Sequence, residues 1–363
     1  MEHHSDTLTI QPVHKNRDAI MFCDQFMSRG ALRYVFGCNA WARSIAEHVE
    51  IDGFIDDVVN EKLFAEKPVI RSSESPSGAL VVSAIVGERP LTALARVRDK
   101  GLSVLDYYAF QKYSGLAIDD VMFLGDVERD FKANRQRYDW LFARLEDAES
   151  RRILTSLINF RLSRDLVFME GFVDAQDRQY FEPFLKLQSS GESFLDVGCY
   201  DGYTTTEFIK RCPDYRDVHV FEPETSNMQR VKSRLSEYRN IHFHPYGASD
   251  RPQTLRFKAA GSSSVVSKDG EISIEVKRID DVISEPCSFL KMDIEGGEMA
   301  ALEGASHTIT KYHPRLAISV YHKVDDLWRI PEKILGMRDD YHVYLRHYTE
   351  GVTETVMFFI PQR

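Results

Sequence analysis

Cysteine is scarce in this sequence, and long apolar runs are missing from it. The five cysteines among 363 residues are scattered, odd in number and include no Cys-x-x-Cys pair. This distribution argues against a disulfide framework or a zinc cluster and is typical of free thiols in a reducing compartment. The sequence shows no signal peptide and no apolar run of about 18 residues, the length that a membrane-spanning helix needs. We therefore expect a soluble, cytoplasmic protein with no membrane contact.

Basic side chains are also fewer than acidic ones. The chain carries 46 basic and 56 acidic side chains, which gives a formal net charge of −10 at pH 7. Because nucleic-acid binding relies on basic groups that neutralise phosphates, we expect no nucleic-acid partner. Repeats and low-complexity tracts are absent. With 363 residues, the chain is long for one hydrophobic core, so two domains are expected.

The most informative segment is 194–202, Phe-Leu-Asp-Val-Gly-Cys-Tyr-Asp-Gly. An apolar strand runs there directly into a glycine turn, and residues 204–210 favour a helix after it. Backbone at such a turn can approach a ligand closely, and the first N–H groups of the helix are free to bind that ligand. The alternative is an ordinary tight strand-to-helix turn of an α/β protein.

A second apolar strand ends in an acidic residue. Residues 218–221 lead to Glu222 and Pro223, and Glu222 lies 26 residues after Asp196. An acid at the tip of the second strand, about 20 or more residues after the glycines, is placed to bind ribose hydroxyls. The proline ends the strand and holds the carboxylate at the edge of the sheet.

Three further apolar strands end in small or polar residues. The strands and the segments that follow them are 241–244 with 245–250, 288–292 with 293–298, and 314–320 with 321–323. Ligands of doubly wound sheets bind at the carboxyl ends of the strands, so we expect all five tips to meet at one crevice. The small residues Gly247 and Ala248 would let a flat ring lie against the backbone.

Taken together, the motifs resemble the FkbM family of S-adenosylmethionine-dependent methyltransferases. The shared elements are Phe-x-Asp-x-Gly-x-x-x-Gly at 194–202, Phe-Glu-Pro at 221–223, Asp-x-Glu-Gly-x-Glu at 293–298 and Tyr-His-Lys-x-x-Asp-Leu-Trp at 321–328. The resemblance covers residues 165–363 and implies a class I methyltransferase fold, a seven-stranded doubly wound sheet whose last strand is antiparallel. Strand patterns at 341–346 and 355–360 fit the end of that sheet.

The resemblance also implies S-adenosylmethionine as the cofactor. The residues predicted to bind it are Asp196, Gly198, Tyr200, Gly202, Glu222, Gly247, Ala248 and Asp293. Glu222 is expected to bind both ribose hydroxyls.

Methyl transfer to oxygen requires deprotonation of the acceptor hydroxyl, and the sequence offers two ways to achieve it. His322 can act directly as the base, because the pKa of histidine lies near working pH. Alternatively, Asp293, Glu295 or Glu298 can hold a divalent metal together with His322 and so lower the pKa of the hydroxyl. We favour the metal-free route, which predicts His322, Asp293 and Glu295 as catalytic residues and no metal ligands. For Glu298 a purely structural reading competes, because a carboxylate in the first turn of a helix is stabilised by the helix dipole.

The first third of the chain predicts a second α/β unit with a broken dinucleotide fingerprint. A strand at 33–36 leads to Gly37, and Asp56 follows 19 residues later, close to the fingerprint spacing. Asn39 replaces the second glycine, and its side chain would crowd a pyrophosphate. We therefore predict a Rossmann-like domain that holds no nicotinamide dinucleotide and either packs on the methyltransferase or presents a substrate.

These patterns divide the chain into three parts: a Rossmann-like domain at 1–115, a charged helical connector at 116–170 and a methyltransferase domain at 171–363. The predicted function is S-adenosylmethionine-dependent O-methylation of a hydroxyl on a small molecule or sugar. One alternative is a nucleotide-sugar-modifying oxidoreductase or epimerase that uses the N-terminal domain, which the broken fingerprint argues against. Another is an inactive methyltransferase fold that binds saccharides or scaffolds a biosynthetic complex. The sequence leaves the acceptor and the oligomeric state open.

Overall fold

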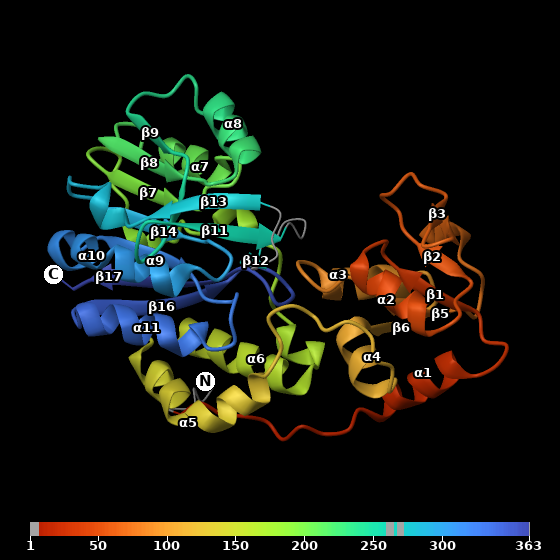
Figure 1. Ribbon diagram of the computed structural model, residues 1–363. Helices are drawn as coiled ribbons and strands as arrows, with labels where there is room; N and C mark the ends of the chain where they lie inside the picture. The colour runs from red at the N-terminus through yellow and green to blue at the C-terminus, as the bar shows by residue number, and fades with distance from the viewer. Residues whose placement is uncertain (1–6, 259–264, 267–271, 363) are drawn as a thin grey trace.

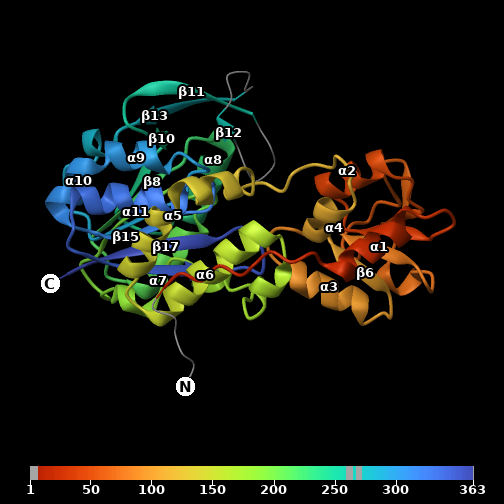
Figure 2. The ribbon, with the colours of Figure 1, turned by 90° about the horizontal axis from the view of Figure 1, so that it is seen from below.

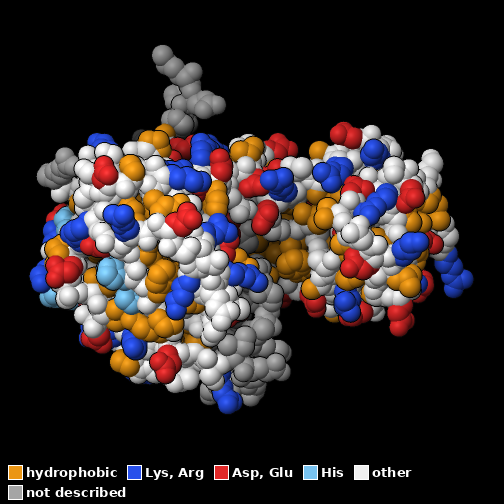
Figure 3. Space-filling model, turned by 90° about the horizontal axis from the view of Figure 1, so that it is seen from above, with side chains coloured by type: hydrophobic (Ala, Val, Ile, Leu, Met, Phe, Trp, Pro, Cys, Tyr) orange, Lys and Arg blue, Asp and Glu red, His pale blue; other side chains and the backbone are white. Residues whose placement is uncertain are grey.

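The structure is a computed structural model, and it describes residues 7–258, 265–266 and 272–362. It contains an N-terminal unit, formed by the elements from α1 to α4, and a C-terminal unit, formed by those from α5 to β17 (Figure 1). A space-filling view shows them as two lobes with a hollow between them (Figure 3). Both units combine helices with a largely parallel sheet, as expected for the α/β class. Within the described residues, no helix is both long and apolar enough to cross a membrane.

The N-terminal unit is built on one sheet with the strand order β3-β4-β2-β1-β5-β6. All neighbouring strands in it are parallel except β3 and β4. Its elements are α1 (Arg17–Met27), β1 (Arg33–Phe36), α2 (Ala40–His48), β2 (Gly53–Ile55), β3 (Leu63–Phe64), β4 (Lys67–Ile70), η1 (Ser72–Glu74), β5 (Leu80–Ser83), α3 (Pro90–Arg98), β6 (Ser103–Asp106) and α4 (Tyr107–Tyr113).

Asn39, which breaks the glycine fingerprint, has a structural task in this unit. Its side-chain oxygen accepts a hydrogen bond from the Ala42 N–H at 3.0 Å, and its amide donates to the Ala84 carbonyl at 2.9 Å. The first bond caps the start of α2, and the second ties the turn to the segment after β5.

The main sheet of the C-terminal unit has the strand order β16-β17-β15-β14-β7-β8-β9. β17 runs antiparallel to β15 and β16, and the other neighbours are parallel. This order agrees with the expected seven-stranded sheet. The strands are β7 (Ser193–Val197), β8 (Asp217–Phe221), β9 (Ile241–His244), β14 (Phe289–Met292), β15 (Arg315–Ser319), β16 (Tyr341–His347) and β17 (Thr355–Pro361).

Helices cover both faces of this sheet (Figures 1 and 2). As a result the inner strand β7 is buried along its whole length, which explains its nearly continuous apolar sequence. The helices are α5 (Val127–Arg144), α6 (Ala148–Ser163), α7 (Tyr203–Arg211), α8 (Thr225–Arg234), α9 (Glu298–Gly304), α10 (Ser306–Tyr312) and α11 (Asp326–Met337), with short 3-10 turns η2 (Leu166–Met169), η3 (Gln176–Arg178), η4 (Pro183–Leu185) and η5 (Ile279–Asp281).

The chain segment between β9 and β14 forms a second, smaller sheet, which sequence analysis did not predict. Its order is β10-β13-β11-β12, formed by β10 (Gly247–Ala248), β11 (Gln253–Lys258), β12 (Val265–Val266) and β13 (Ile272–Lys277). Gly247 and Ala248, expected only as small residues after a strand, therefore form a short strand of their own. The alternating residues of β13 are the signal that was available for it.

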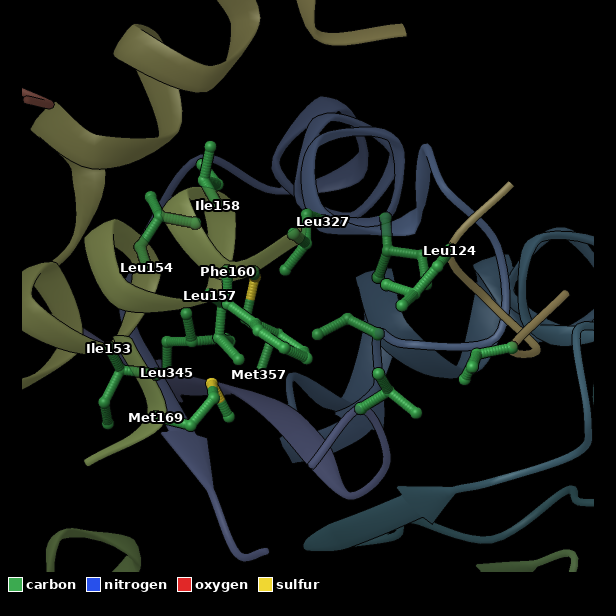
Figure 4. Packing of buried hydrophobic residues seen from close by; sticks show 14 of the residues in the cluster. Leu124, Ile153, Leu154, Leu157, Ile158, Phe160, Met169, Leu327, Leu345 and Met357 are labelled. Carbon is green, nitrogen blue, oxygen red and sulfur yellow. The ribbon is translucent and has the colours of Figure 1, made fainter. Parts of the chain in front are cut away.

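The helices α5 and α6 pack into the core of the C-terminal unit. Figure 4 shows the apolar face of α6, including Leu154 and Leu157, against Leu345 of β16 and Met357 of β17. The hydroxyl of Ser150 accepts a hydrogen bond from the Leu345 N–H at 2.9 Å. The helical segment predicted as a connector is therefore fixed to the edge of the main sheet.

Candidate active site

A cavity of about 480 Å³ lies at the carboxyl ends of β7, β8 and β14. The turns after these strands form part of its wall, and the small sheet from β10 to β13 forms another part. Ligands of doubly wound sheets bind at this position, and sites for small molecules have volumes of about 300–1,000 Å³. The expectation that the five strand tips meet at one crevice is confirmed, because Gly247 and Lys323, from the segments after the other two strands, line the cavity as well.

Six of the eight residues predicted to bind the cofactor line this cavity: Gly198, Tyr200, Glu222, Gly247, Ala248 and Asp293. The other two do not reach it. Gly202, with φ +83°, directly precedes α7. Asp196 is fully buried, accepts a hydrogen bond from the Thr205 hydroxyl at 2.7 Å and lies 3.2 Å from the ammonium group of Lys291. Asp196 therefore joins β7 to β14 and α7, and the prediction that it contacts the cofactor is corrected.

The turn after β7 packs tightly against the turn after β14. Gly198 has φ +80°, and a Cβ atom there would lie 1.9 Å from the carbonyl oxygen of Asp293. Lys291 donates to the Gly198 carbonyl at 2.6 Å and so holds the two turns together. Tyr200 and Glu295, one in each turn, both line the cavity and have left-handed φ values of +53° and +54°. Such strained backbone conformations are often found at functional sites.

The carboxylate of Glu222 is fixed at the tip of β8 by the backbone. It accepts hydrogen bonds from the Tyr200 N–H at 3.1 Å and the Glu224 N–H at 2.9 Å. Burial raises the pKa of Glu222 above its ordinary value, although these N–H groups act in the opposite direction. The carboxylate is thus held in one orientation at the cavity wall, and each oxygen keeps a lone pair for a ligand.

The small sheet supplies an apolar wall that sequence analysis missed. Leu255 from β11, with Ile274 and Val276 from β13, lines the cavity. A Cβ atom at Gly247 would lie only 3.1 Å from Val276 Cγ1. The absence of a side chain at Gly247 therefore leaves room for Val276 in this part of the wall. A flat, apolar ring system fits such a wall.

Beside the cavity, His322 lies among three carboxylates. Its Nε2 atom is 3.3 Å from Asp293 Oδ1 and 3.5 Å from Glu295 Oε2, and its Nδ1 atom is 3.0 Å from Glu298 Oε1. Asp293 and Glu295 line the cavity, whereas the side chains of His322 and Glu298 are each only 1% exposed. The structure therefore brings together the predicted catalytic residues, with Glu298 beside them.

This environment changes the acid–base behaviour of His322. Burial alone would lower the pKa of His322, but the carboxylates of Glu298, Asp293 and Glu295 outweigh burial and raise it to about 10. The imidazole therefore keeps its proton at neutral pH. The expectation that His322 titrates near working pH is wrong, because the sequence did not show how many carboxylates surround it.

Three further polar residues border the cluster and were not predicted. The Tyr180 hydroxyl donates to Asp293 Oδ2 at 2.6 Å, and the Tyr321 hydroxyl lies 3.3 Å from Glu354 Oε1. Burial, followed by the negative charge of Glu298, raises the pKa of Asp326 to about 7. Tyr180 and Glu354 come from segments far from His322 in the sequence, so local spacing held no signal for their convergence, whereas Asp326 lies in the 321–328 motif that also contains His322.

Comparison with known proteins agrees with this architecture. Residues 196–348 match the family model described as the methyltransferase FkbM domain. The 2-O-methyltransferase NoeI of Sinorhizobium fredii is 25% identical over 151 residues, which cover 34% of this chain and 62% of that protein. The crystal structure of methyltransferase FkbM from Methylobacillus flagellatus has a TM-score of 0.73 and 24% sequence identity, with 95% of this chain and 98% of that one covered. The match to NoeI spans less than two thirds of that relative.

The seven-stranded sheet and the cavity at its strand tips define the C-terminal unit as a methyltransferase fold. Within that unit, residues 196–348 match the methyltransferase FkbM domain, as the sequence resemblance implied. The likeness to the Methylobacillus structure extends over both units, so the N-terminal unit is part of the shared fold.

Proposed function

We propose that this protein is an S-adenosylmethionine-dependent O-methyltransferase that acts on a hydroxyl group of a small molecule or sugar. The observation that carries the proposal is a cavity lined both by a fixed carboxylate, Glu222, and by the carboxylates of Asp293 and Glu295. The 2-O-methyltransferase activity in the name of NoeI supports oxygen as the acceptor atom.

The residues of the cavity suit the proposed cofactor. Glu222 would bind the ribose hydroxyls, and the wall of Leu255, Ile274 and Val276 would pack against the adenine ring. Gly198 lets the backbone turn lie close to the ligand, since its left-handed φ and its contact with Asp293 leave no room for a side chain. Bound there, S-adenosylmethionine supplies the methyl group.

The acidic residues beside His322 would position the acceptor. Asp293 and Glu295 line the cavity and can accept a hydrogen bond, and then the proton, from an acceptor hydroxyl. The Tyr180 hydroxyl holds Asp293 Oδ2 in place with a 2.6 Å hydrogen bond, and Oδ1 lies 3.3 Å from the His322 ring. Such fixed orientation is the main contribution that a protein makes to an in-line displacement.

Calorimetry of S-adenosylhomocysteine binding tests the cofactor assignment. Glu222→Ala removes a charge-assisted hydrogen-bond acceptor, which typically costs about 1.5–3 kcal/mol, or roughly ten- to hundredfold in affinity. The control is Glu303→Ala, which removes an exposed carboxylate from α9. Equal affinities in the two variants would contradict the role of Glu222 at the ribose.

Transfer of a radiolabelled methyl group tests the reaction itself. Free sugars, glycosides and small alcohols would be offered as acceptors, and label is expected in a methyl ether. Tight binding of S-adenosylhomocysteine without transfer to any acceptor would favour the inactive binding or scaffold protein instead.

For the N-terminal unit we propose a structural or substrate-presenting role. The Asp56 carboxylate accepts hydrogen bonds from the N–H groups of Cys38 at 3.0 Å, Val58 at 2.8 Å and Val59 at 3.1 Å. The Asn39 side chain occupies the turn after β1. The Asp56 carboxylate and this turn are therefore engaged in hydrogen bonds within the N-terminal unit itself. These contacts support the prediction that no nicotinamide dinucleotide binds here.

A further inference from the structure

Asp293, Glu298 and His322 contain four buried polar atoms that have no hydrogen-bond partner in the described part of the chain. These atoms are Asp293 Oδ1, Glu298 Oε2 and both ring nitrogens of His322. The residues lie at ion-pair distances, yet the ring N–H directions do not meet the carboxylate oxygens as hydrogen bonds do. Buried polar atoms in native proteins nearly always have a partner, and an ion absent from the coordinates is one explanation for exceptions.

We propose that Asp293, Glu298 and His322 form a binding site for one divalent cation. Each residue can offer one ligand atom, and these atoms lie within 4.8 Å of one another. Ligand atoms that each lie about 2.0–2.3 Å from one ion are at most about 4.6 Å apart, so small side-chain movements bring all three onto a single ion. Two carboxylates and one imidazole suit Mn²⁺, with Mg²⁺ as a competitor.

The charge around the site favours a cation. Glu295 Oε2 lies 3.5 Å from His322 Nε2, and the buried Asp326 adds a further carboxylate. The nearest buried ammonium, Lys291, is already paired with Asp196 at 3.2 Å. The buried ring of His322 therefore faces the carboxyl groups of Asp293, Glu295 and Glu298, with Asp326 close by, and uncompensated buried charge is costly. A bound dication would remove most of this imbalance.

The ion would have access to the cavity. Asp293 lines the cavity while Glu298 and His322 lie behind it, so an ion on these ligands would have its open side toward the cavity. An acceptor hydroxyl that binds the ion there would lose its proton more readily. That chemical role rests on the proposed methyl transfer, whereas ion binding does not. The inference also reverses the sequence-based preference for a metal-free route.

Mn²⁺ binding to the full-length chain, followed by the electron paramagnetic resonance signal of free Mn²⁺, tests the site. We expect one Mn²⁺ per wild-type chain, displaceable by Mg²⁺. Glu298→Gln should weaken binding by about tenfold or more, as loss of a metal ligand or its support typically does. Glu303→Gln is the matched control, because Glu303 lies on the same helix with an exposed side chain.

A second measurement needs no variant, in case Glu298→Gln fails to fold. Electron spin echo spectra of Mn²⁺ on the wild-type chain should show a directly coordinated ¹⁴N nucleus, which His322 supplies. Absence of stoichiometric Mn²⁺ binding, or bound Mn²⁺ without a nitrogen ligand, would overturn the inference and leave His322 as an imidazolium paired with its carboxylates.

The outcomes also separate this inference from the proposed function. Glu298 does not line the cavity, so Glu298→Gln should still bind S-adenosylhomocysteine. Methyl transfer that persists without Mn²⁺ binding would refute the metal site alone. Mn²⁺ binding in a chain that has no affinity for S-adenosylhomocysteine would refute the proposed function alone.

Discussion

Two glycines in the loop after β7 allow a matched test of how the site is built. Gly198 and Gly202 have almost the same left-handed φ, +80° and +83°. They differ in the space around them, because a Cβ atom at Gly198 would lie 1.9 Å from the Asp293 carbonyl oxygen and one at Gly202 would lie 3.5 Å from its nearest neighbour. Alanine at each position therefore separates backbone strain from steric overlap.

The expected magnitudes follow from these two terms. A left-handed conformation costs a non-glycine residue roughly 1–2 kcal/mol, so Gly202→Ala should destabilise the C-terminal unit by about that amount. Gly198→Ala carries the same cost plus overpacking against fixed backbone, about 1–3 kcal/mol more. Because the overlap pushes apart the turns after β7 and β14, Gly198→Ala should also weaken S-adenosylhomocysteine binding much more than Gly202→Ala does.

Differential scanning calorimetry of the two variants and the wild type measures the stability term. For a unit of this size about 1 kcal/mol corresponds to a shift of roughly 2–4 °C in Tm, so Gly198→Ala should melt clearly below Gly202→Ala. Calorimetric titration with S-adenosylhomocysteine measures the second effect. Equal losses of stability and affinity in the two variants would refute the close packing of the β7 and β14 turns.

Two further predictions concern other parts of the chain. Titration of the full-length protein with NAD and NADP should show no saturable binding at micromolar concentrations, and a micromolar dissociation constant would contradict the role given to Asn39. Burial, together with the neighbouring His242, lowers the pKa of His219 from 6.5 to about 4, so the stability contributed by neutral His219 is present above pH 6.5 and is lost as pH falls toward 4. Thermal melts should therefore show a smaller acid destabilisation for His219→Gln than for the wild type, and the exposed control His307→Gln should not change it.

Sequence reasoning succeeded where the signal was local. The signals used were apolar strands, the glycine turns after them and the proline that ends one strand, and each lies within a few residues of the site residue it predicts. Gly198, Glu222 and Asp293 were predicted from these signals, and all three line the cavity. Asp196 was misplaced because its environment depends on strand pairing. It sits opposite Lys291 across β7 and β14, and that register is not visible in either segment alone.

The acidic cluster is a second case in which the environment of a residue could not be predicted from local sequence. The carboxylates of 293–298 were recognised, but the behaviour of His322 depends on how many of them converge on a buried ring. The hydrogen bond from Tyr180 to Asp293 spans 113 residues and has no sequence signature. Burial and long-range convergence set the electrostatics here, and neither follows from spacing.

The segment after α4 gives the N-terminal unit a physical connection to this cluster. Near its middle, the Asp119 N–H donates to the Ser44 hydroxyl of α2 at 2.8 Å. A few residues later, the Phe123 ring packs edge-on against the His322 ring, with 5.5 Å between centroids and an interplanar angle of 75°. Phe123 itself has a left-handed φ of +66°, a conformation that a bulky residue holds only when its surroundings fix it.

The same short segment is hydrogen-bonded to α2 through Asp119 and packs on His322 through Phe123, so it connects the N-terminal unit with the acidic cluster. The turn between β16 and β17 adds a second link, since Glu350 accepts a hydrogen bond from the Thr92 N–H at 2.7 Å and so caps α3. A unit that only bound its own cofactor would need neither contact. These links support the proposal that the N-terminal unit serves the methyltransferase unit and is not an independent dinucleotide-binding domain.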